Sequence, residues 1–230
     1  MDDLALLRLE LATLWVTDAT GALRHCRTPD EEPAPALVVA AGASGVVWAS
    51  NHTIADPVRA ALEARLADEP GGGALGWAPR CKDALLDTLG GTDRAEPHGG
   101  PSYVFEGSPA APDSVDLRSS EATDLAWLQD RLPEPDRDLT APWVVAIVDD
   151  AVAAVCETAR STPTSVEAGV WTYEPHRRKG LGAAVTAAWS ARVADRTAFY
   201  STSWTNAASQ GVARHLGLRP LGQWWQVSHR

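Results

Sequence analysis

Short apolar runs separated by polar turns fill the middle of the second half of the chain. Runs of this length that are rich in β-branched and aromatic residues are typical of strands. Asp149-Asp150 is a tight-turn dipeptide of the kind that joins two antiparallel strands. We therefore expect an antiparallel meander of strands at 143–148, 151–160 and 166–173, preceded by a short strand at 115–118 and a helix at 121–131.

After this meander the apolar period changes from that of a strand to that of a helix. Leu181, Val185, Trp189 and Val193 recur every four positions, so they share one face of a helix that begins near Gly182. The pattern then predicts a strand at 197–204, a helix from Asn206 to Leu216 that Gly217 ends, and a last strand at 223–229.

The first half of the chain has a less regular pattern. Leu4, Leu7 and Leu11 have helical spacing, and Asp56 is a candidate helix cap with Pro57 at the first helical position. Gly42-Ala43-Ser44-Gly45 misses a nucleophile elbow by one position and is predicted to be a turn. The expected elements are a helix at 4–11, strands at 13–16, 37–40 and 46–49, a helix that starts at 56 and a helix at 82–89.

Residues 91–115 are richer in Pro and Gly than the segments before and after them. Two Pro- and Gly-rich stretches surround one short predicted strand, Tyr103–Phe105, which is typical of a domain junction. We place the boundary near Pro112. The sequence thus predicts an α/β (α+β) protein with an accessory N-terminal α+β domain at 1–112 and a second domain at 113–230.

The composition is that of a globular protein, with 230 residues of which 45% are apolar and 22% are charged. No apolar run reaches the roughly 18 residues that a membrane-spanning helix needs. The chain opens with Met-Asp-Asp-Leu, where a secretory signal would carry Lys or Arg. We expect a cytoplasmic protein with no membrane partner.

The formal net charge is −10, and residues 1–110 hold most of it, with 16 acidic and 8 basic side chains. General nucleic-acid binding requires clustered Lys and Arg along a phosphate backbone, so we expect no nucleic-acid partner. The acidic half is compatible with a cationic substrate and equally with a role in solubility.

Cysteines and histidines provide no candidate metal site. Cys26, Cys81 and Cys156 are far apart and odd in number, so they indicate neither a disulfide framework nor a Cys-x-x-Cys pair. The six histidines have no spacing typical of ligands. We expect no metal and interpret the cysteines as small buried residues.

One compact basic cluster, Arg177-Arg178-Lys179, stands before two glycines, Gly180 and Gly182, where a predicted strand gives way to a helix. A helix N-terminus has about four N–H groups without intrahelical acceptors and the positive end of the helix dipole. Glycines remove the Cβ atoms that would keep an anion away from those groups. The segment is therefore a candidate pyrophosphate site.

Two other phosphate-binding motifs do not fit this segment. A P-loop requires Gly-x-x-x-x-Gly-Lys-Ser/Thr, which the chain lacks. A dinucleotide fingerprint would place Val185 where Gly or Ala belongs, and it requires an acid after the next strand, which here ends in Ser201-Thr202-Ser203-Trp204.

The segment resembles the acyl-CoA-binding motif of the GNAT superfamily of N-acyltransferases, Arg/Gln-x-x-Gly-x-Gly/Ala, through Arg177, Gly180 and Gly182. Downstream, a strand, an Asn-started helix and Leu216-Gly217-Leu218 are also similar to that superfamily. Within it, the chain looks most like the FR47-like group, through Ala-Gly-Val-Trp-Thr at 168–172 and Ser-Thr-Ser-Trp-x-Asn at 201–206. The resemblance covers about residues 114–230.

This resemblance implies a mixed, splayed β-sheet flanked by helices, with coenzyme A bound where the strands at 166–173 and 197–204 part. Asn206 would hydrogen-bond the pantetheine arm, or it could serve only as a helix cap, and Trp171 could equally be plain core. The residues implied for binding are Val170, Trp171 and Thr172 for the arm, Arg177 in the motif, and the amides of Arg178, Lys179, Gly180, Leu181 and Gly182 for the pyrophosphate.

Acyl transfer to an amine requires a base, because a free alkylammonium has a pKa near 10. Glu157 and Glu167 lie within apolar strand sequence, where a carboxylate is costly unless it is paired or exposed. Glu167 sits where the superfamily often keeps a strand-borne base. Two plainer interpretations stay open: Glu157 could pair with Arg160 or another neighbour, and Glu167 could face solvent.

The resemblance also implies a departure from the family, since Ala213 stands at the position where many members have a tyrosine acid. The activity that the resemblance implies is that of an N-acyltransferase, which would move acetyl from acetyl-CoA to a primary amine by direct attack. The amine would belong to a small molecule or a peptide, and a homodimer is compatible with the sequence. The alternative is a catalytically degenerate module that binds acyl-CoA as a sensor.

Overall fold

A computed structural model describes residues 1–28, 30–91, 95–134 and 138–229, and the chain in it divides into two compact units. Unit 1 comprises Met1–Ser102, Ser201–Asn206 and Pro220–Arg230, and unit 2 comprises Tyr103–Tyr200 and Ala207–Arg219. The chain first changes unit after Ser102, before the boundary expected near Pro112. It then returns to unit 1 twice, so no single cut separates the two units. Residues 92–94 of the expected junction lie outside the described residues.

The described residues of unit 1 form three helices and two groups of strands. Strand order in the larger group is β4-β3-β11-β5, and β1 pairs only with β2. The elements are α1 (Asp3–Leu14), β1 (Trp15–Thr17), β2 (Leu23–Cys26), β3 (Leu37–Gly42), β4 (Gly45–Ser50), α2 (Asp56–Leu66), α3 (Lys82–Thr88), the first part of β5 (Ala95–Val104) and most of β11 (Arg219–His229).

Local sequence explains most of these elements. Asp2 caps α1 by accepting a hydrogen bond from the Ala5 N–H at 2.7 Å. The strand predicted at 13–16 is wrong in its start, because α1 continues to Leu14 and β1 begins only at Trp15. The α2 cap also moves by one residue: Ala55 is the N-cap, and Asp56 is the first helical residue.

The second correction in unit 1 concerns β5, which is a strand of ten residues where a Pro- and Gly-rich junction is predicted. A Cβ atom on Gly99 would lie 2.0 Å from the Trp224 carbonyl oxygen, and one on Gly100 would lie 1.6 Å from that of Thr202. These glycines are required because neighbouring backbone passes close to the strand.

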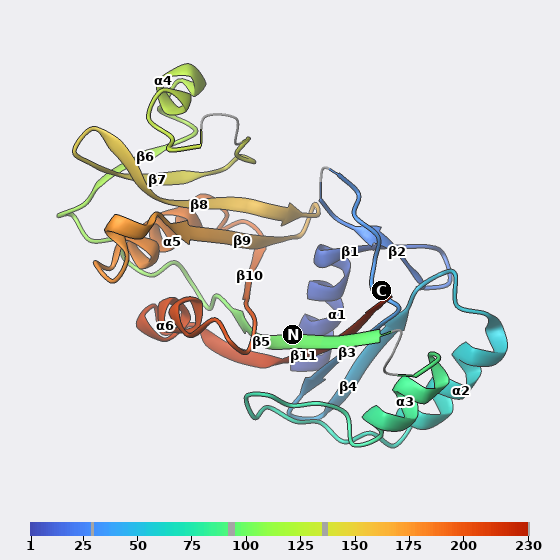
Figure 1. Cartoon of the computed structure of the whole chain (residues 1–230). Coiled ribbons are helices and arrows are strands. Elements are labelled where there is room, and N and C mark those ends of the chain that lie inside the picture. Colours follow the sequence, from blue (N-terminus) through green and yellow to red (C-terminus); the bar gives the residue numbers. More distant parts are fainter. Residues whose placement is uncertain (29, 92–94, 135–137, 230) are drawn as a thin grey trace. The chain divides into compact units, whose positions relative to one another are not determined.

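Unit 2 contains an antiparallel meander, β6-β7-β8-β9, to which β10 adds in parallel (Figure 1). Asp149 and Asp150 both have positive φ, 52° and 61°, as a two-residue hairpin turn between β7 and β8 requires. The elements are β6 (Asp116–Ser119), α4 (Leu125–Gln129), β7 (Val144–Val148), β8 (Ala151–Ser161), β9 (Ser165–Thr172), the 3-10 turn η1 (Glu174–His176), α5 (Leu181–Arg192), β10 (Thr197–Ser201) and α6 (Ala207–His215).

Three predicted elements of this half differ in length from the observed ones. The helix expected at 121–131 is the short α4, because the Asp124 carboxylate accepts from the N–H groups of Ala126 and Trp127 and so fixes a later start. The strand expected to reach Trp204 ends at Ser201, and β11 begins at Arg219, earlier than predicted.

Helix α5 packs on one face of the meander and is buried over its first ten residues. Its Trp189 indole N–H lies 3.1 Å from both the Pro142 carbonyl oxygen and the Thr158 hydroxyl. Cys156 and Ala168 belong to the core cluster under α5, whereas Val155 belongs to a second cluster on the other side of the sheet. We call these two sides the α5 face and the opposite face.

The mixed α+β architecture and the splayed parallel strand next to the meander agree with the fold that the sequence predicts for residues 113–230. Within the described part of the chain, no helix combines the length and the apolar character needed to cross a membrane.

Candidate functional site

The candidate anion site is the loop between β9 and α5. The 3-10 turn η1 follows β9, and after it Arg178 and Gly180 adopt left-handed backbone conformations, with φ values of 62° and 79°. Gly180 is the N-cap of α5, and its carbonyl accepts from the Ala184 N–H at 3.0 Å. A left-handed N-cap is costly for any residue with a Cβ, which explains the glycine.

Four N–H groups at the start of α5, those of residues 180–183, precede the first intrahelical hydrogen bond. A Cβ built on Gly180 would meet no atom within 4 Å, so the space beside this cap is open. A Cβ built on Gly182 would lie 3.2 Å from the Thr172 hydroxyl and 3.5 Å from Val212. The residues present therefore fit a phosphate group that approaches the helix end.

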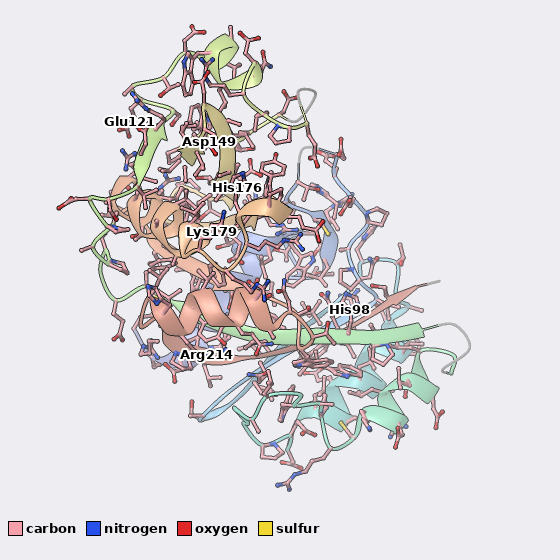
Figure 2. The ribbon with its side chains drawn as sticks, turned by 60° about the vertical axis from the view of Figure 1, so that its left-hand side comes forward. His98, Glu121, Asp149, His176, Lys179 and Arg214 are labelled. Atoms are coloured by element: carbon pink, nitrogen blue, oxygen red, sulfur yellow. The ribbon has the colours of Figure 1, made fainter. Side chains whose placement is uncertain are left out.

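Positive charge surrounds this helix end. Arg177 donates through Nε to the Thr172 carbonyl oxygen at 3.2 Å, which ties the loop to the end of β9. Arg178 and Lys179 are exposed, and neither forms an ion pair with another residue in the described ranges. Figure 2 labels Lys179 and His176 on this loop and Arg214 on α6. The helix dipole and the exposed cations act together on an anion.

Strands β9 and β10 pair over only three residues before they part. The pairs are Thr197 with Ser165, Ala198 with Val166, and Phe199 with Glu167. We call the point after the Glu167–Phe199 pair the β9/β10 fork, beyond which Figure 1 draws β10 running away from β9. Val170, Trp171 and Thr172, the residues expected to hold an extended arm, lie on β9 past this fork.

Glu157 and Glu167 both lie on the opposite face, because Cys156 and Ala168 beside them face α5 and side chains alternate along a strand. Glu167 is 2% exposed, so the interpretation that it faces solvent is wrong. Glu157 accepts a hydrogen bond from the Thr140 N–H at 2.7 Å. The register partner of Arg160 is Glu167, whereas that of Glu157 is Gly169, which adds no side chain beside the carboxylate.

Asn206 directly precedes α6 and is exposed, and its backbone N–H donates to the Ser203 carbonyl oxygen at 3.2 Å. It belongs to unit 1, whereas the loop at Arg177–Gly182 belongs to unit 2. The two expected roles of Asn206 therefore stay predictions.

Ala213 is fully buried in the core cluster of the α5 face, and its methyl side chain has no hydroxyl to donate. The same cluster contains Tyr200, which belongs to a hydroxyl pair that the sequence does not predict. The Tyr200 hydroxyl on β10 lies 2.7 Å from the Ser209 hydroxyl on α6. Only the burial of a tyrosine within an apolar strand could have indicated it, since the two residues come from different elements.

Cys156 is fully buried, and this burial raises the pKa of its thiol well above the usual value. The thiol therefore stays protonated at neutral pH and is a poor nucleophile. Within residues 1–28, 30–91, 95–134 and 138–229, no group of three or more His, Cys, Asp and Glu side chains is arranged to hold a metal ion.

The sequence matches no protein-family model and no curated protein. Solved structures similar to this chain include a GCN5-related N-acetyltransferase-like protein from Streptococcus suis, at 15% identity and a TM-score of 0.49, over 86% of this chain and 85% of that one. A GCN5-related N-acetyltransferase from Kribbella flavida matches at 18% identity and a TM-score of 0.44, over 64% of this chain and 63% of that one.

A tandem GNAT protein from the clavulanic acid biosynthesis pathway matches at 15% identity and a TM-score of 0.43, over 84% of this chain and 62% of that one. Three of the matched solved chains, that from Kribbella among them, are spanned over 66%, 64% and 63% of their length, less than two thirds. Because these TM-scores lie below 0.5, any assignment of activity rests on the residues and geometry of this chain.

Proposed function

We propose that this chain is an acyl-CoA-dependent N-acyltransferase of the GNAT type that transfers acetyl from acetyl-CoA to a primary amine. One observation within unit 2 carries the proposal. The glycine-containing basic loop at Arg177–Gly182 connects β9 to the N-terminus of α5, and it does so just after β9 has parted from its parallel neighbour β10. An anion site beside a strand edge that β10 no longer pairs suits a ligand with a pyrophosphate and an extended amide-bearing arm.

The residues divide the binding of the co-substrate between two elements. The N–H groups from Arg178 to Gly182 and the charges of Arg177 and Lys179 would bind the pyrophosphate. The backbone of Val170, Trp171 and Thr172, which lies past the fork, would bind the pantetheine arm as a neighbouring strand would. Leu181 contributes its N–H and anchors the helix in the core, and Asn206 is proposed as a further contact to the arm.

The acceptor amine would be deprotonated on the opposite face. Glu167, the last residue paired before the fork, is the proposed base, and Glu157 shares the same face. Either carboxylate could take the proton directly or through a water molecule. Cys156 is protonated and buried on the α5 face, which favours direct attack by the amine over an acyl-cysteine route.

The acceptor is proposed to be a primary amine of a small molecule or a peptide, and the site of action to be the cytoplasm. Release of the coenzyme A thiol from acetyl-CoA with a panel of primary amines tests the reaction. We expect thiol release that depends on the amine and that Glu167→Gln reduces strongly. Binding of acetyl-CoA without consumption in the presence of every amine would contradict the transferase and favour the sensor.

A further inference from the structure

The hydroxyl of the buried Tyr200 and that of the partly exposed Ser209 form a polar pair at the β9/β10 fork. Tyr200 is the first residue of β10 after the last β9/β10 pair, and it is 2% exposed. Its ring belongs to the core cluster of the α5 face and meets Tyr103 edge-on, with ring centroids 6.4 Å apart. A buried tyrosine hydroxyl usually has a hydrogen-bond partner, and here that partner is Ser209 on α6.

The position of the pair relative to Glu167 is the second observation. Phe199, which pairs with Glu167, is followed directly by Tyr200, whose side chain points to the α5 face while Glu167 lies on the opposite face. The two polar groups thus flank the fork, one on each face of the sheet. A reacting group held between the strands just past the fork would have a carboxylate on one side and a hydroxyl on the other.

Resting on the proposed function, we infer that Tyr200 donates a hydrogen bond to the sulfur of the departing coenzyme A thiolate, and that Ser209 orients its hydroxyl. In this step the amine nitrogen bonds to the carbonyl carbon, and the C–S bond breaks with its electron pair on sulfur. The amine proton passes to Glu167 and on to solvent, and the thiolate takes a proton from solvent on release.

The hydrogen-bond geometry allows this assignment. Either hydroxyl of the pair could be the donor, so Ser209 can donate to the Tyr200 oxygen and leave the tyrosine proton for the ligand. The Tyr200 hydroxyl also lies 3.3 Å from the Ser209 carbonyl oxygen, which is long for an O–H···O hydrogen bond, and the sulfur would replace this oxygen as the acceptor. Burial raises the pKa of Tyr200 to about 12, so the hydroxyl keeps its proton throughout the physiological range.

The helix that carries Ser209 supports the same placement. Ser209 and Ala213 are four residues apart, so they share one face of α6, and Ala213 is buried in the cluster that contains Tyr200. The small side chain at 213 leaves this part of the α5 face to the tyrosine from β10.

Tyr200→Phe removes only the hydroxyl and is the variant that tests the assignment. Loss of a hydrogen bond to a charged group predicts a decrease in kcat of about 10- to 100-fold with acetyl-CoA. Tyr103→Phe is the matched control, since Tyr103 is a neighbouring buried tyrosine whose ring contacts Tyr200. We expect this control to keep kcat within a few-fold.

The leaving group separates a chemical role from a structural one. Acetyl-pantetheine releases an alkyl thiol, whereas phenyl thioacetate releases a more acidic aryl thiol that needs less stabilisation. The Tyr200→Phe defect should persist with the first donor and shrink to a few-fold with the second. An equal defect with both donors, or an unchanged kcat with acetyl-CoA, overturns the assignment.

Two further measurements keep the outcome interpretable. Thermal stabilisation of Tyr200→Phe by coenzyme A shows that the variant folds and binds, and Ser209→Ala, which leaves the tyrosine in place, should produce a smaller defect of the same donor dependence. If the unmodified protein turns over no acyl donor, the proposed function fails and this inference fails with it. Turnover with normal Tyr200→Phe activity refutes the inference alone.

Discussion

Gly180→Val is the perturbation that most cleanly separates backbone strain from ligand binding. Gly180 has φ of 79°, and a Cβ there would meet no atom within 4 Å, so the substitution costs backbone strain without a clash of the added Cβ. A left-handed conformation costs a residue with a Cβ about 1–2 kcal/mol. For a chain of this size, that cost lowers Tm by about 2–8 °C.

The effect on binding is larger and different in kind. A ligand present at a hundredfold excess over its Kd stabilises the native state by about 2.7 kcal/mol, which raises Tm by about 5–10 °C. We expect coenzyme A to give this rise with the unmodified protein. Gly180→Val places a branched side chain in the open space beside the helix end, so the rise should be lost.

Gly217→Val is the matched control for this experiment. Gly217 also has positive φ, 63°, and open space around its Cβ position, but it follows the C-terminus of α6. It should lose similar stability and keep the rise with coenzyme A. Equal stabilisation of Gly180→Val and Gly217→Val by coenzyme A would show that the ligand does not bind at this helix end.

Three further outcomes follow from the structure. Ser102→Ala should lower the free energy of unfolding by about 1–3 kcal/mol in denaturant titrations, because the Ser102 hydroxyl lies 2.7 and 2.6 Å from the two oxygens of the buried Glu10 carboxylate; a loss within error would contradict this. His215→Ala should leave kcat within a few-fold, because His215 is exposed at the end of α6, whereas Glu167→Gln should lower kcat strongly. Loss of activity in His215→Ala with kcat preserved in Glu167→Gln would contradict Glu167 as the base. Burial raises the pKa of Tyr200 from 10.0 to about 12, so the native state holds the hydroxyl proton more tightly than the unfolded state does. The stability that this proton contributes is therefore complete below pH 10 and is lost as the pH rises to about 12. Between these pH values the unmodified protein should lose up to about 3 kcal/mol more stability than Tyr200→Phe, and parallel curves for the two proteins would refute the burial argument.

The elements of unit 2 could be predicted from sequence because their signals are local. Two aspartates fix the β7/β8 turn, a four-residue apolar period marks α5, and glycines stand where the backbone takes positive φ. The loop at Arg177–Gly182 could be found for the same reason, since its helix end, its glycines and its cations are contiguous.

Contacts between distant segments decide the parts that the sequence did not predict. Gly99 and Gly100 are typical of a loop in sequence, but they lie in strand β5. Glycine is required at both positions because the backbone at Trp224 and Thr202 passes too close for any side chain. The pairing of Tyr200 with Ser209 depends on how α6 packs against β10, and the register of β8 on β9 decides that Arg160 stands opposite Glu167. No periodicity reports such partners.

A crystal structure of the protein with acetyl-CoA would show directly whether the loop at Arg177–Gly182 and strand β9 bind the co-substrate. We expect the pyrophosphate within hydrogen-bond distance of N–H groups in the segment 178–182, and the pantetheine arm alongside Val170, Trp171 and Thr172, past the β9/β10 fork. A pyrophosphate bound elsewhere, or an arm that makes no contact with β9, would contradict this expectation.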